Sequence, residues 1–211
     1  MPNGLLTLSF DNGPDPAATP RVLDVLAARG LRATFFVVGS ALREHRALAE
    51  RAHAEGHWIG NHTLTHPRPL GESGAEVCEI EAAQAELGAL AHPDRLFRPS
   101  GAGGDLSPGL LSTAAVESLV AGRFTCVLWN AVPGDWEDPE GWVDRALQQV
   151  AEHEWTLLVL HDVGGACADR LDEFLARVDA EIVQAFPPGC VPIKRGAVRR
   201  SLGPYLKGQA P

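Results

Sequence analysis

Side chains that could bind a metal ion or transfer a proton follow apolar, strand-like segments along this sequence. In a parallel α/β barrel the carboxyl ends of all strands open on one face, so side chains placed there converge. Structural histidines and carboxylates would instead be scattered over helix surfaces and strand starts. The sequence therefore predicts one site for acid–base or metal chemistry, built from Asp11, Asn12, His62, His66, Arg98, Asp135 and His161.

The first strand-like segment ends in a carboxylate and an amide. Residues 5–10 alternate and are apolar enough for a buried strand, and Gly13-Pro14 breaks the chain just behind Asp11 and Asn12. A strand that delivers two polar side chains to its carboxyl end is typical of α/β enzymes. Asp-Asn-Gly-Pro is also an ordinary turn sequence, so this segment alone leaves both interpretations open.

Two histidines stand four residues apart after another short strand. The imidazoles of His62 and His66 could share one metal ion at this spacing. The alternative is a pair of loop histidines facing water, because H-x-x-x-H is common. The remaining histidines fall in or near expected helices and are interpreted as solvent-facing or capping residues: His45, His53, His57, His92 and His153.

His161 follows five apolar residues and would leave a buried strand directly into the site. Asp135 could hold its ring protonated and oriented as an acid. Arg98 could hold Asp11 ionised, because a guanidinium binds a carboxylate in a fixed fork. The structural alternatives are a satisfied core histidine, a turn at Asp135 and a salt bridge without a catalytic role.

The elements that must position these residues alternate between strand and helix along the whole chain. This alternation indicates parallel strands joined by crossover helices, in a barrel or an open sheet. A weak seventh strand and a missing eighth unit favour an α/β fold with a distorted, incomplete (β/α) barrel of about seven parallel strands. Strands are expected at 5–10, 34–38, 58–60, 96–98, 124–129, 156–160 and 191–193, and helices at 19–30, 40–56, 73–91, 107–122, 138–150 and 169–186.

Composition limits the other possibilities. The 211 residues are 45% hydrophobic and carry a net charge of -9, which predicts a single domain over 1–211 without a nucleic-acid or anionic-membrane footprint. A short basic tail is expected from about residue 194. Four scattered cysteines without C-x-x-C spacing, and no export leader before the first strand, favour the cytoplasm. Removal of an export signal from a longer chain would place the protein outside the cytoplasm instead.

Taken together, the motifs resemble the polysaccharide deacetylases, also called the NodB-homology or carbohydrate esterase family 4 domain. All five family motifs occur in order between residues about 5 and 162. The similar segments are 9–14 (SFDNGP, for T-F-D-D-G-P), 56–66 (GHWIGNHTLTH, for G-H-E-I-G-N-H-T-x-x-H), 97–101 (FRPSG, for F-R-P-P-x-G), 134–136 (GDW, for the end of D-x-x-D-W) and 157–161 (LLVLH, for L-x-H).

The resemblance implies a distorted (β/α) barrel and metal-dependent hydrolysis of a non-peptide amide, usually with release of acetate from an N-acetylated sugar. It implies a divalent metal ion, zinc in the first place, with Co²⁺, Ni²⁺ or Mn²⁺ as alternatives. The implied roles are general base for Asp11, general acid for His161, orientation of these two by Arg98 and Asp135, metal ligation by His62 and His66, oxyanion binding by the Gly101 N–H, and a sugar-stacking surface at Trp136.

Asn12 departs from the family pattern, since most relatives have a carboxylate ligand there. A neutral amide oxygen binds a divalent cation less strongly, so weaker metal affinity is expected. Ser100 and Gly101 replace bulkier residues and would widen the pocket. An N-acetylated sugar or glycan is the leading substrate. The alternatives are a small amide such as a cyclic imide, ureide or formamide, and a catalytically silent glycan-binding homologue.

Overall fold

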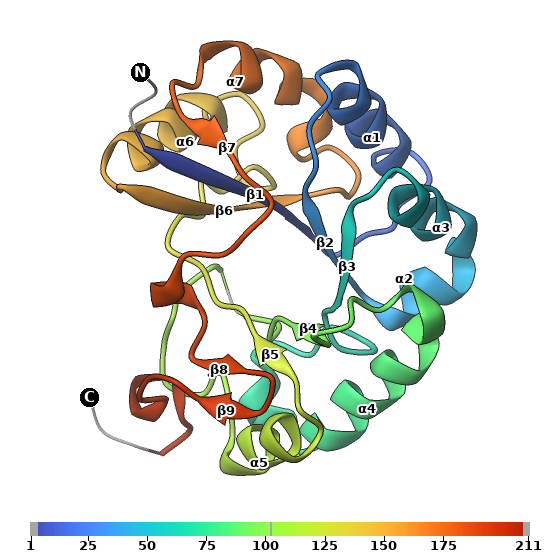
Figure 1. Ribbon diagram of the computed structural model, residues 1–211, viewed down its shortest axis with the longest axis vertical. Helices are drawn as coiled ribbons and strands as arrows, with labels where there is room; N and C mark the ends of the chain where they lie inside the picture. The colour runs from blue at the N-terminus through green and yellow to red at the C-terminus, as the bar shows by residue number, and fades with distance from the viewer. Residues whose placement is uncertain (1–3, 102, 209–211) are drawn as a thin grey trace.

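A computed structural model describes residues 4–101 and 103–208. Its strands form one curled sheet in the order β6-β1-β2-β3-β4-β5-β8-β9, with β7 also paired to β1 (Figure 1). The strands are β1 (Leu5–Asp11), β2 (Thr34–Val37), β3 (Trp58–Asn61), β4 (Leu96–Phe97), β5 (Thr125–Cys126), β6 (Trp155–His161), β7 (Glu181–Ile182), β8 (Ile193–Lys194) and β9 (Ala197–Val198).

The helices surround the outside of this sheet (Figure 1). They are α1 (Thr19–Ala28), α2 (Gly39–Glu44), α3 (Arg46–Ala54), α4 (Glu76–Leu87), α5 (Thr113–Ala121), α6 (Trp142–Ala151) and α7 (Leu171–Arg177). Short 3-10 helices cover Leu70–Glu72, Gly88–Leu90, Cys167–Asp169, Pro188–Cys190 and Gly203–Tyr205. None of the helices in the described part of the chain is long and apolar enough to cross a membrane.

The expected distorted, incomplete barrel is confirmed. Strands β1 to β7 are joined by parallel pairings. The strand expected at 191–193 corresponds to β8, but β8 pairs antiparallel with β5 and not in parallel as expected. Strand β9, which pairs antiparallel with β8, was not predicted. An isolated parallel bridge between Ala131 and Leu158 brings the segment after β5 to β6, so the two ends of the parallel sheet approach each other.

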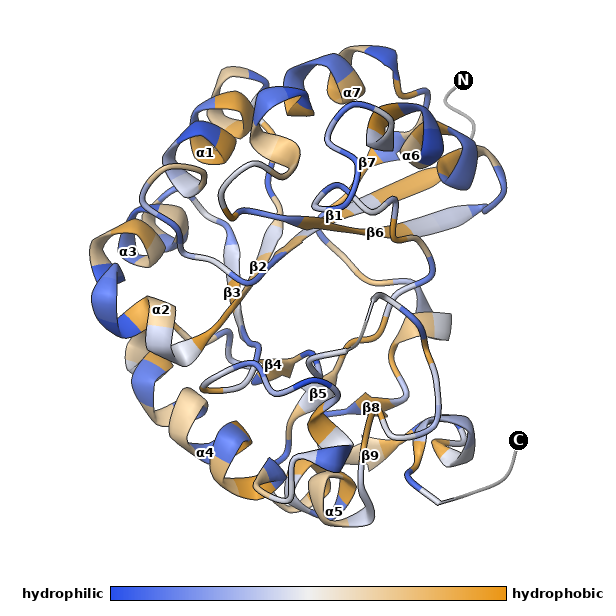
Figure 2. Cartoon of the chain, turned by 180° about the vertical axis from the view of Figure 1, so that it is seen from behind, coloured by the Kyte–Doolittle hydropathy of each residue, from blue (hydrophilic) through white to orange (hydrophobic). Residues whose placement is uncertain are grey.

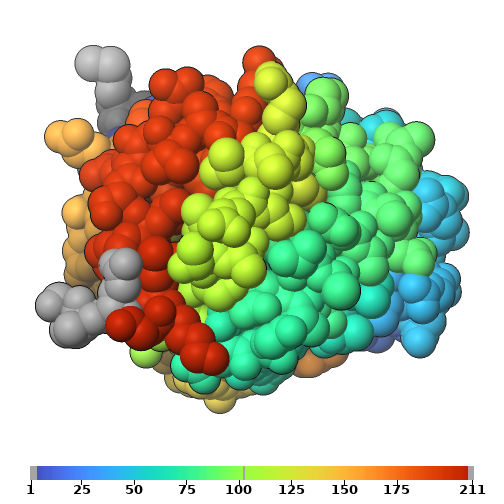
Figure 3. Space-filling view, turned by 90° about the horizontal axis from the view of Figure 1, so that it is seen from below, coloured from blue at the N-terminus to red at the C-terminus, as the bar shows by residue number. Residues whose placement is uncertain are grey.

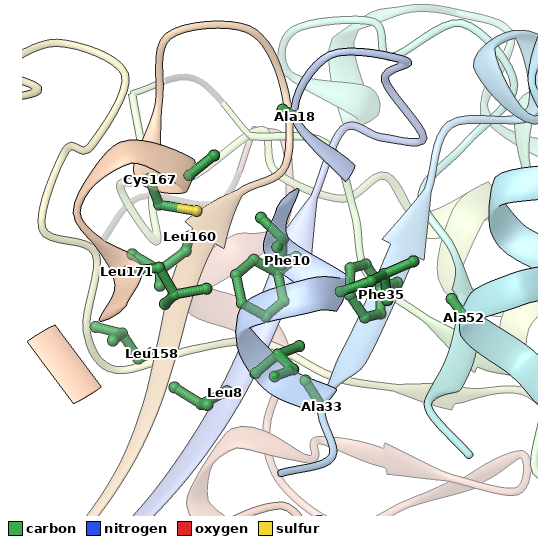
Figure 4. Packing of buried hydrophobic residues seen from close by; sticks show 14 of the residues in the cluster. Leu8, Phe10, Ala18, Ala33, Phe35, Ala52, Leu158, Leu160, Cys167 and Leu171 are labelled. Atoms are coloured by element: carbon green, nitrogen blue, oxygen red, sulfur yellow. The ribbon is translucent and has the colours of Figure 1, made fainter. Parts of the chain in front are cut away.

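The alternation along β1 divides the molecule into an outer core and an inner polar layer. Leu6, Leu8 and Phe10 are fully buried and belong to the outer core, where Phe10 stacks on Phe35 of β2 with ring centroids 5.0 Å apart (Figure 4). Because successive strand residues point to opposite faces, Ser9 and Asp11 turn the other way, toward the barrel interior. The helices show orange apolar patches mixed with blue polar residues (Figure 2), as surface helices do.

Several helices differ from their predicted bounds. The helix expected at 40–56 is divided into α2 and α3 at His45, whose φ and ψ of -127° and 36° leave the helical region. The helix expected at 169–186 is α7 alone, and β7 takes the place of its second half. There the Glu181 N–H donates to the Gly4 carbonyl, and the Val183 N–H donates to the Leu6 carbonyl. Hydrogen bonds to β1 and its flank thus replace the hydrogen bonds that a helix would have made.

The C-terminal segment is packed rather than a free tail. Leu111 donates its N–H to the Tyr205 carbonyl and accepts the Lys207 N–H. In Figure 3 the red C-terminal atoms accordingly lie against the yellow-green segment that precedes and includes α5. Residues from about 194 are basic as predicted, but β8, β9 and these contacts attach them to the barrel.

Candidate active site

The residues expected to do chemistry meet at the carboxyl ends of the strands. Asp11 and His161 are the last residues of β1 and β6 and are register partners across these neighbouring strands. His62 directly follows β3, and Arg98 directly follows β4. A pocket of about 190 Å³ opens among them, and its wall includes Asp11, Asn12, His62, His66, Gly101, Trp136 and His161.

Asp11 is buried and held by Arg98. The Arg98 Nη1 donates to the Asp11 Oδ1 and to the Ser9 hydroxyl, both at 2.8 Å, and the guanidinium also donates to the carbonyls of Val127 and Leu128 at 3.3 and 3.5 Å. Burial works against ionisation of Asp11. The charge and the hydrogen bond of Arg98, together with the charge of His161, outweigh it, and the pKa of Asp11 lies below its usual value.

The loop that carries both metal-ligand candidates is fixed by side-chain hydrogen bonds to its backbone. The Asn61 Oδ1 accepts the Thr63 N–H at 2.9 Å, and the Thr63 hydroxyl accepts the His66 N–H at 3.0 Å. From α4, the Glu79 carboxylate accepts the N–H groups of the two intervening residues at 2.9 and 2.8 Å. Thr63 and His66 adopt φ of 68° and 60°, which side-chain-bearing residues keep only where the surroundings hold them.

The two imidazoles lie against each other, with ring centroids 4.9 Å apart. The His62 Nδ1 lies 2.9 Å from the Arg98 carbonyl oxygen, to which it donates in the tautomer that leaves Nε2 free. That Nε2 is 3.6 Å from the Asp11 Oδ2. Burial is the main cause that lowers the pKa of both rings, for His66 to about 3. Both rings are therefore neutral, the form that binds a cation.

Asn12 supplies a third donor that fits a divalent cation. Its Oδ1 is buried without a hydrogen-bond partner among the described residues, and its side chain lines the same pocket as His62 and His66. Two imidazole nitrogens and one amide oxygen suit zinc and neighbouring transition metals. The Arg68 Nε donates to the His66 Nδ1 at 3.3 Å. A neutral imidazole has only one acceptor nitrogen, and a bound cation would use it. A cation bound at either nitrogen of His66 would therefore displace this hydrogen bond.

His161 is held by Asp135 through both its ring and its backbone. The Asp135 Oδ1 lies 2.8 Å from the His161 Nδ1, and its Oδ2 accepts the His161 N–H at 2.8 Å. Burial lowers the pKa of His161, but the hydrogen bond and the charge of Asp135 outweigh it, so the pKa lies above its ordinary value. Trp136 packs edge-on against the ring, with centroids 4.6 Å apart, and remains 37% exposed at the pocket mouth.

The third motif forms another part of the wall. No described residue accepts a hydrogen bond from the Gly101 N–H. A Cβ at this position would lie 3.5 Å from Trp129, an ordinary contact, so glycine does leave the wall more open than a larger residue would. Ser100 does not line the pocket, because its buried hydroxyl donates to the Pro67 carbonyl at 2.5 Å.

Other side chains that shape the site were not assigned a role from the sequence. Asp162 accepts the Gly13 N–H at 3.1 Å and the Thr19 hydroxyl at 2.6 Å, which fixes the turn behind Asn12. Its position directly after His161 is the sequence feature from which a role in the site could have been predicted. No sequence motif distinguishes Glu79 or Arg68 as residues of the site. His57 was expected at the surface, but it is buried and its Nδ1 accepts the Ala33 N–H at 3.0 Å.

In this site a carboxylate and a histidine face one small pocket, beside two neutral imidazoles. Amide and ester hydrolases typically combine such acid–base residues with ligands for a metal ion. The chain belongs to the polysaccharide deacetylase family, whose model matches residues 1–110. The resemblance inferred from the five motifs is thereby confirmed, and the protein is an enzyme of this family.

Relatives and solved structures agree with this assignment. A chitooligosaccharide deacetylase from Sinorhizobium fredii is 37% identical over 159 residues, which cover 74% of this chain and 70% of the relative. A peptidoglycan-N-acetylglucosamine deacetylase from Bacillus cereus is 29% identical over 174 residues, covering 78% and 76%. The structure of a family 4 acetyl xylan esterase from Clostridium thermocellum in complex with a cobalt ion is similar with a TM-score of 0.66, at 27% identity and 85% and 87% coverage.

Proposed function

We propose that the protein removes acetate from N-acetylglucosamine units of a glycan, in a reaction that depends on a bound divalent metal ion, with zinc as the first candidate. The observation that carries the proposal is the pair formed by Asp11 and His161, which face one pocket from register positions on neighbouring strands. The names of the two curated relatives, which act on chito-oligosaccharide and peptidoglycan, support this substrate class.

Asp11 is the general base in this proposal. Its lowered pKa keeps the carboxylate ionised at neutral pH, and Arg98 holds one oxygen so that the other faces the pocket. Asp11 takes a proton from the attacking water as that water forms a bond to the acetamide carbon. His62, His66 and Asn12 would hold the cation, which when bound supplies Lewis-acid polarisation of the carbonyl.

His161 is the general acid. Its raised pKa favours the protonated ring, and Asp135 holds the Nδ1 so that Nε2 can deliver a proton to the leaving nitrogen. An amine leaves only when it is protonated, so this step completes the break of the C–N bond. The Gly101 N–H, which has no partner among the described residues, would donate to the oxyanion that forms on the former carbonyl.

The shape of the site favours a sugar chain over a small cyclic amide. A pocket of about 190 Å³ has room for one acetamido group with part of its sugar ring and equally for a small cyclic amide, so the preference rests on the pocket mouth. Trp136 is partly exposed at the mouth and offers a flat surface to a neighbouring sugar. The silent-homologue alternative has little support here, because both the base and the acid are present with their positioning partners.

Acetate release provides the test. Protein treated with a chelator and then supplied with Zn²⁺ should release acetate from N-acetylglucosamine oligomers, and chelated protein should not. Asp11→Asn should remove the activity while circular dichroism stays unchanged. Turnover of cyclic imides without any acetate release from the oligomers would replace the proposal by the small-amide alternative. Failure of Asp11→Asn to reduce the rate would exclude Asp11 as the base.

A further inference from the structure

A second and larger cavity lies at the opposite end of the barrel from the site. It is lined by Trp58, Leu96 and Thr125, which are the first residues of β3, β4 and β5. The catalytic residues, by contrast, stand at or after the last residues of their strands. The cavity measures about 720 Å³, within the 300 to 1,000 Å³ that is usual for small-molecule sites.

One wall of this cavity is aromatic. Trp58 lies beside Phe186 and His92, with ring centroids 5.6 and 4.7 Å apart. The His92 Nδ1 accepts the Asp94 N–H at 3.1 Å, so the neutral ring carries its hydrogen on Nε2 and can donate through it. Such a wall offers π faces and one hydrogen-bond donor to a planar ligand.

The rim of the cavity is basic. Lys194, Arg199 and Arg200 line it, and none of them forms an ion pair with a carboxylate among the residues that the structure describes. The acidic residue in the lining, Asp94, is already bound by Arg195 at 2.7 Å. Three unpaired cations around one cavity stand out in a chain with a net charge of -9.

We propose that this cavity binds a planar aromatic ring that carries a phosphate, as a mononucleotide does. The ring would stack on Trp58 or Phe186, since base–aromatic stacking does not depend on the identity of the base. The phosphate would lie at Arg199 and Arg200, whose guanidinium groups match phosphate oxygens in pairs. The cavity does not include any residue of the catalytic pocket, so this site is independent of the proposed deacetylase reaction.

Four probes separate the contribution of the ring from that of the phosphate. Isothermal titration calorimetry of the full chain with AMP and UMP should show binding to one site, with similar affinities because stacking tolerates either base. Adenosine, which lacks the phosphate, and ribose 5-phosphate, which lacks the ring, should each bind at least about tenfold more weakly. Equal binding of ribose 5-phosphate would overturn the assignment of an aromatic ligand, and no heat with AMP would overturn the site.

A matched pair of variants locates the binding. The double variant Arg199→Gln and Arg200→Gln removes two exposed cations from the rim and should weaken AMP at least about tenfold, the loss of one charge-assisted hydrogen bond. Lys207→Gln removes an exposed cation of the same C-terminal segment outside the cavity and should leave the affinity unchanged. Equal weakening of AMP binding in both variants would show that the affinity depends only on net charge. Unchanged binding in the double variant would show that AMP binds at another site, such as the catalytic pocket.

Discussion

Arg98 is the residue that holds Asp11, the proposed general base, in place. Its side chain is entirely buried, with the guanidinium 4.1 Å above the Phe36 ring, and its donors reach Asp11, Ser9 and two backbone carbonyls. A buried charge is tolerated when its partners satisfy it, but removal of one partner leaves the other charge unpaired. Arg98 therefore both stabilises the fold around Asp11 and fixes the direction of the carboxylate.

Replacement of Arg98 by methionine should lower the free energy of unfolding by about 3–5 kcal/mol, because the Asp11 carboxylate then lies buried without its cation. Urea unfolding followed by circular dichroism measures this loss. Arg98→Lys retains the charge without the planar fork, and it should recover part of the stability but little of the acetate release. Equal stability of the methionine variant and the parent would contradict this account of Arg98.

In the proposed mechanism, Asp135 sets the pH range in which His161 can act as an acid. Asp135 raises the pKa of His161, so the ring stays protonated to higher pH and activity should fall only above that raised value. In Asp135→Asn the pKa of His161 should drop, so the alkaline limb of the pH profile of kcat/KM should move to lower pH. The maximal rate should also fall by about 10²–10⁴, the usual contribution of a positioned acid. An alkaline limb that does not move would show that another group limits the rate there.

Asn12 should determine how tightly the site binds its cation. In Asn12→Asp an ionised oxygen takes the place of the buried Oδ1, which has no partner among the described residues, and divalent metal affinity should increase by about tenfold or more. Competition against a chromogenic chelator measures the change. Gln148→Glu is the control, because it adds the same charge at an exposed position outside the pocket. Unchanged affinity in Asn12→Asp would count against ligation at this position.

The turn after β1 is an element whose stability should depend on pH. Asp162 lies beneath it, and burial raises the pKa of its carboxyl to about 7 from 3.8. The folded state thus binds more protons than the unfolded chain between about pH 4 and pH 7, and stability should fall as pH rises through that window, by an amount on the order of a few kcal/mol. Protonated Asp162 can donate to the Thr19 hydroxyl and still accept the Gly13 N–H.

Asp162→Asn offers the same donor and acceptor as the protonated acid at every pH. Unfolding free energies measured at pH 5 and pH 8 should therefore differ less in this variant than in the parent. Thr156→Val serves as a comparison, because its hydroxyl is buried without a hydrogen-bond partner among the described residues and it should leave the pH dependence intact. If Asp162→Asn keeps the full difference, other groups are responsible for it.

The ends of the strands were predictable from the sequence, and the ends of the helices mostly were not. The strand-like segments that stop at Asp11 and His161 leave few choices of register, because both faces of these strands are buried. The helix expected from residue 107 begins only at Thr113, where the Ser112 hydroxyl accepts the Ala115 N–H. Ser107 and Pro108 upstream could have begun a helix equally well, but in the structure the backbone of Leu111 pairs with Tyr205 and Lys207 of the C-terminal segment.

The site itself was recoverable because its chemistry is concentrated at strand ends. Asp11 and His161 end a strand, and His62 and Arg98 directly follow one, so one topological rule brings them together. Glu79 could not be found in this way, because it lies on a helix and acts on the backbone of the histidine loop. Its role depends on how α4 lies against β3, a tertiary relation that local sequence does not specify.

At the scale of the whole molecule, the barrel separates two cavities that share no lining residue. The catalytic pocket lies at one end, and the basic cavity lies at the other. A packed series of rings occupies the interior between them: Phe36 contacts the Arg98 guanidinium at 4.1 Å on one side and Phe186 at a centroid distance of 6.5 Å on the other. The same interior therefore supports the base at one end and the aromatic wall at the other.

Metal binding should stabilise the folded chain as a whole, since the three proposed ligands Asn12, His62 and His66 come together only when β1 and the histidine loop after β3 are both in place. At a free Zn²⁺ concentration 100 times the dissociation constant the gain is about 2.7 kcal/mol, which corresponds to roughly 5–10 °C in Tm for a domain of this size. Thermal melts of chelator-treated protein with and without Zn²⁺ measure the shift. His66→Ala should lose most of it, and Mg²⁺ should produce little, because Mg²⁺ prefers an oxygen-rich octahedral site that two imidazoles do not supply. A shift from Mg²⁺ as large as that from Zn²⁺, or a full shift in His66→Ala, would show that the cation binds somewhere other than between the two histidines.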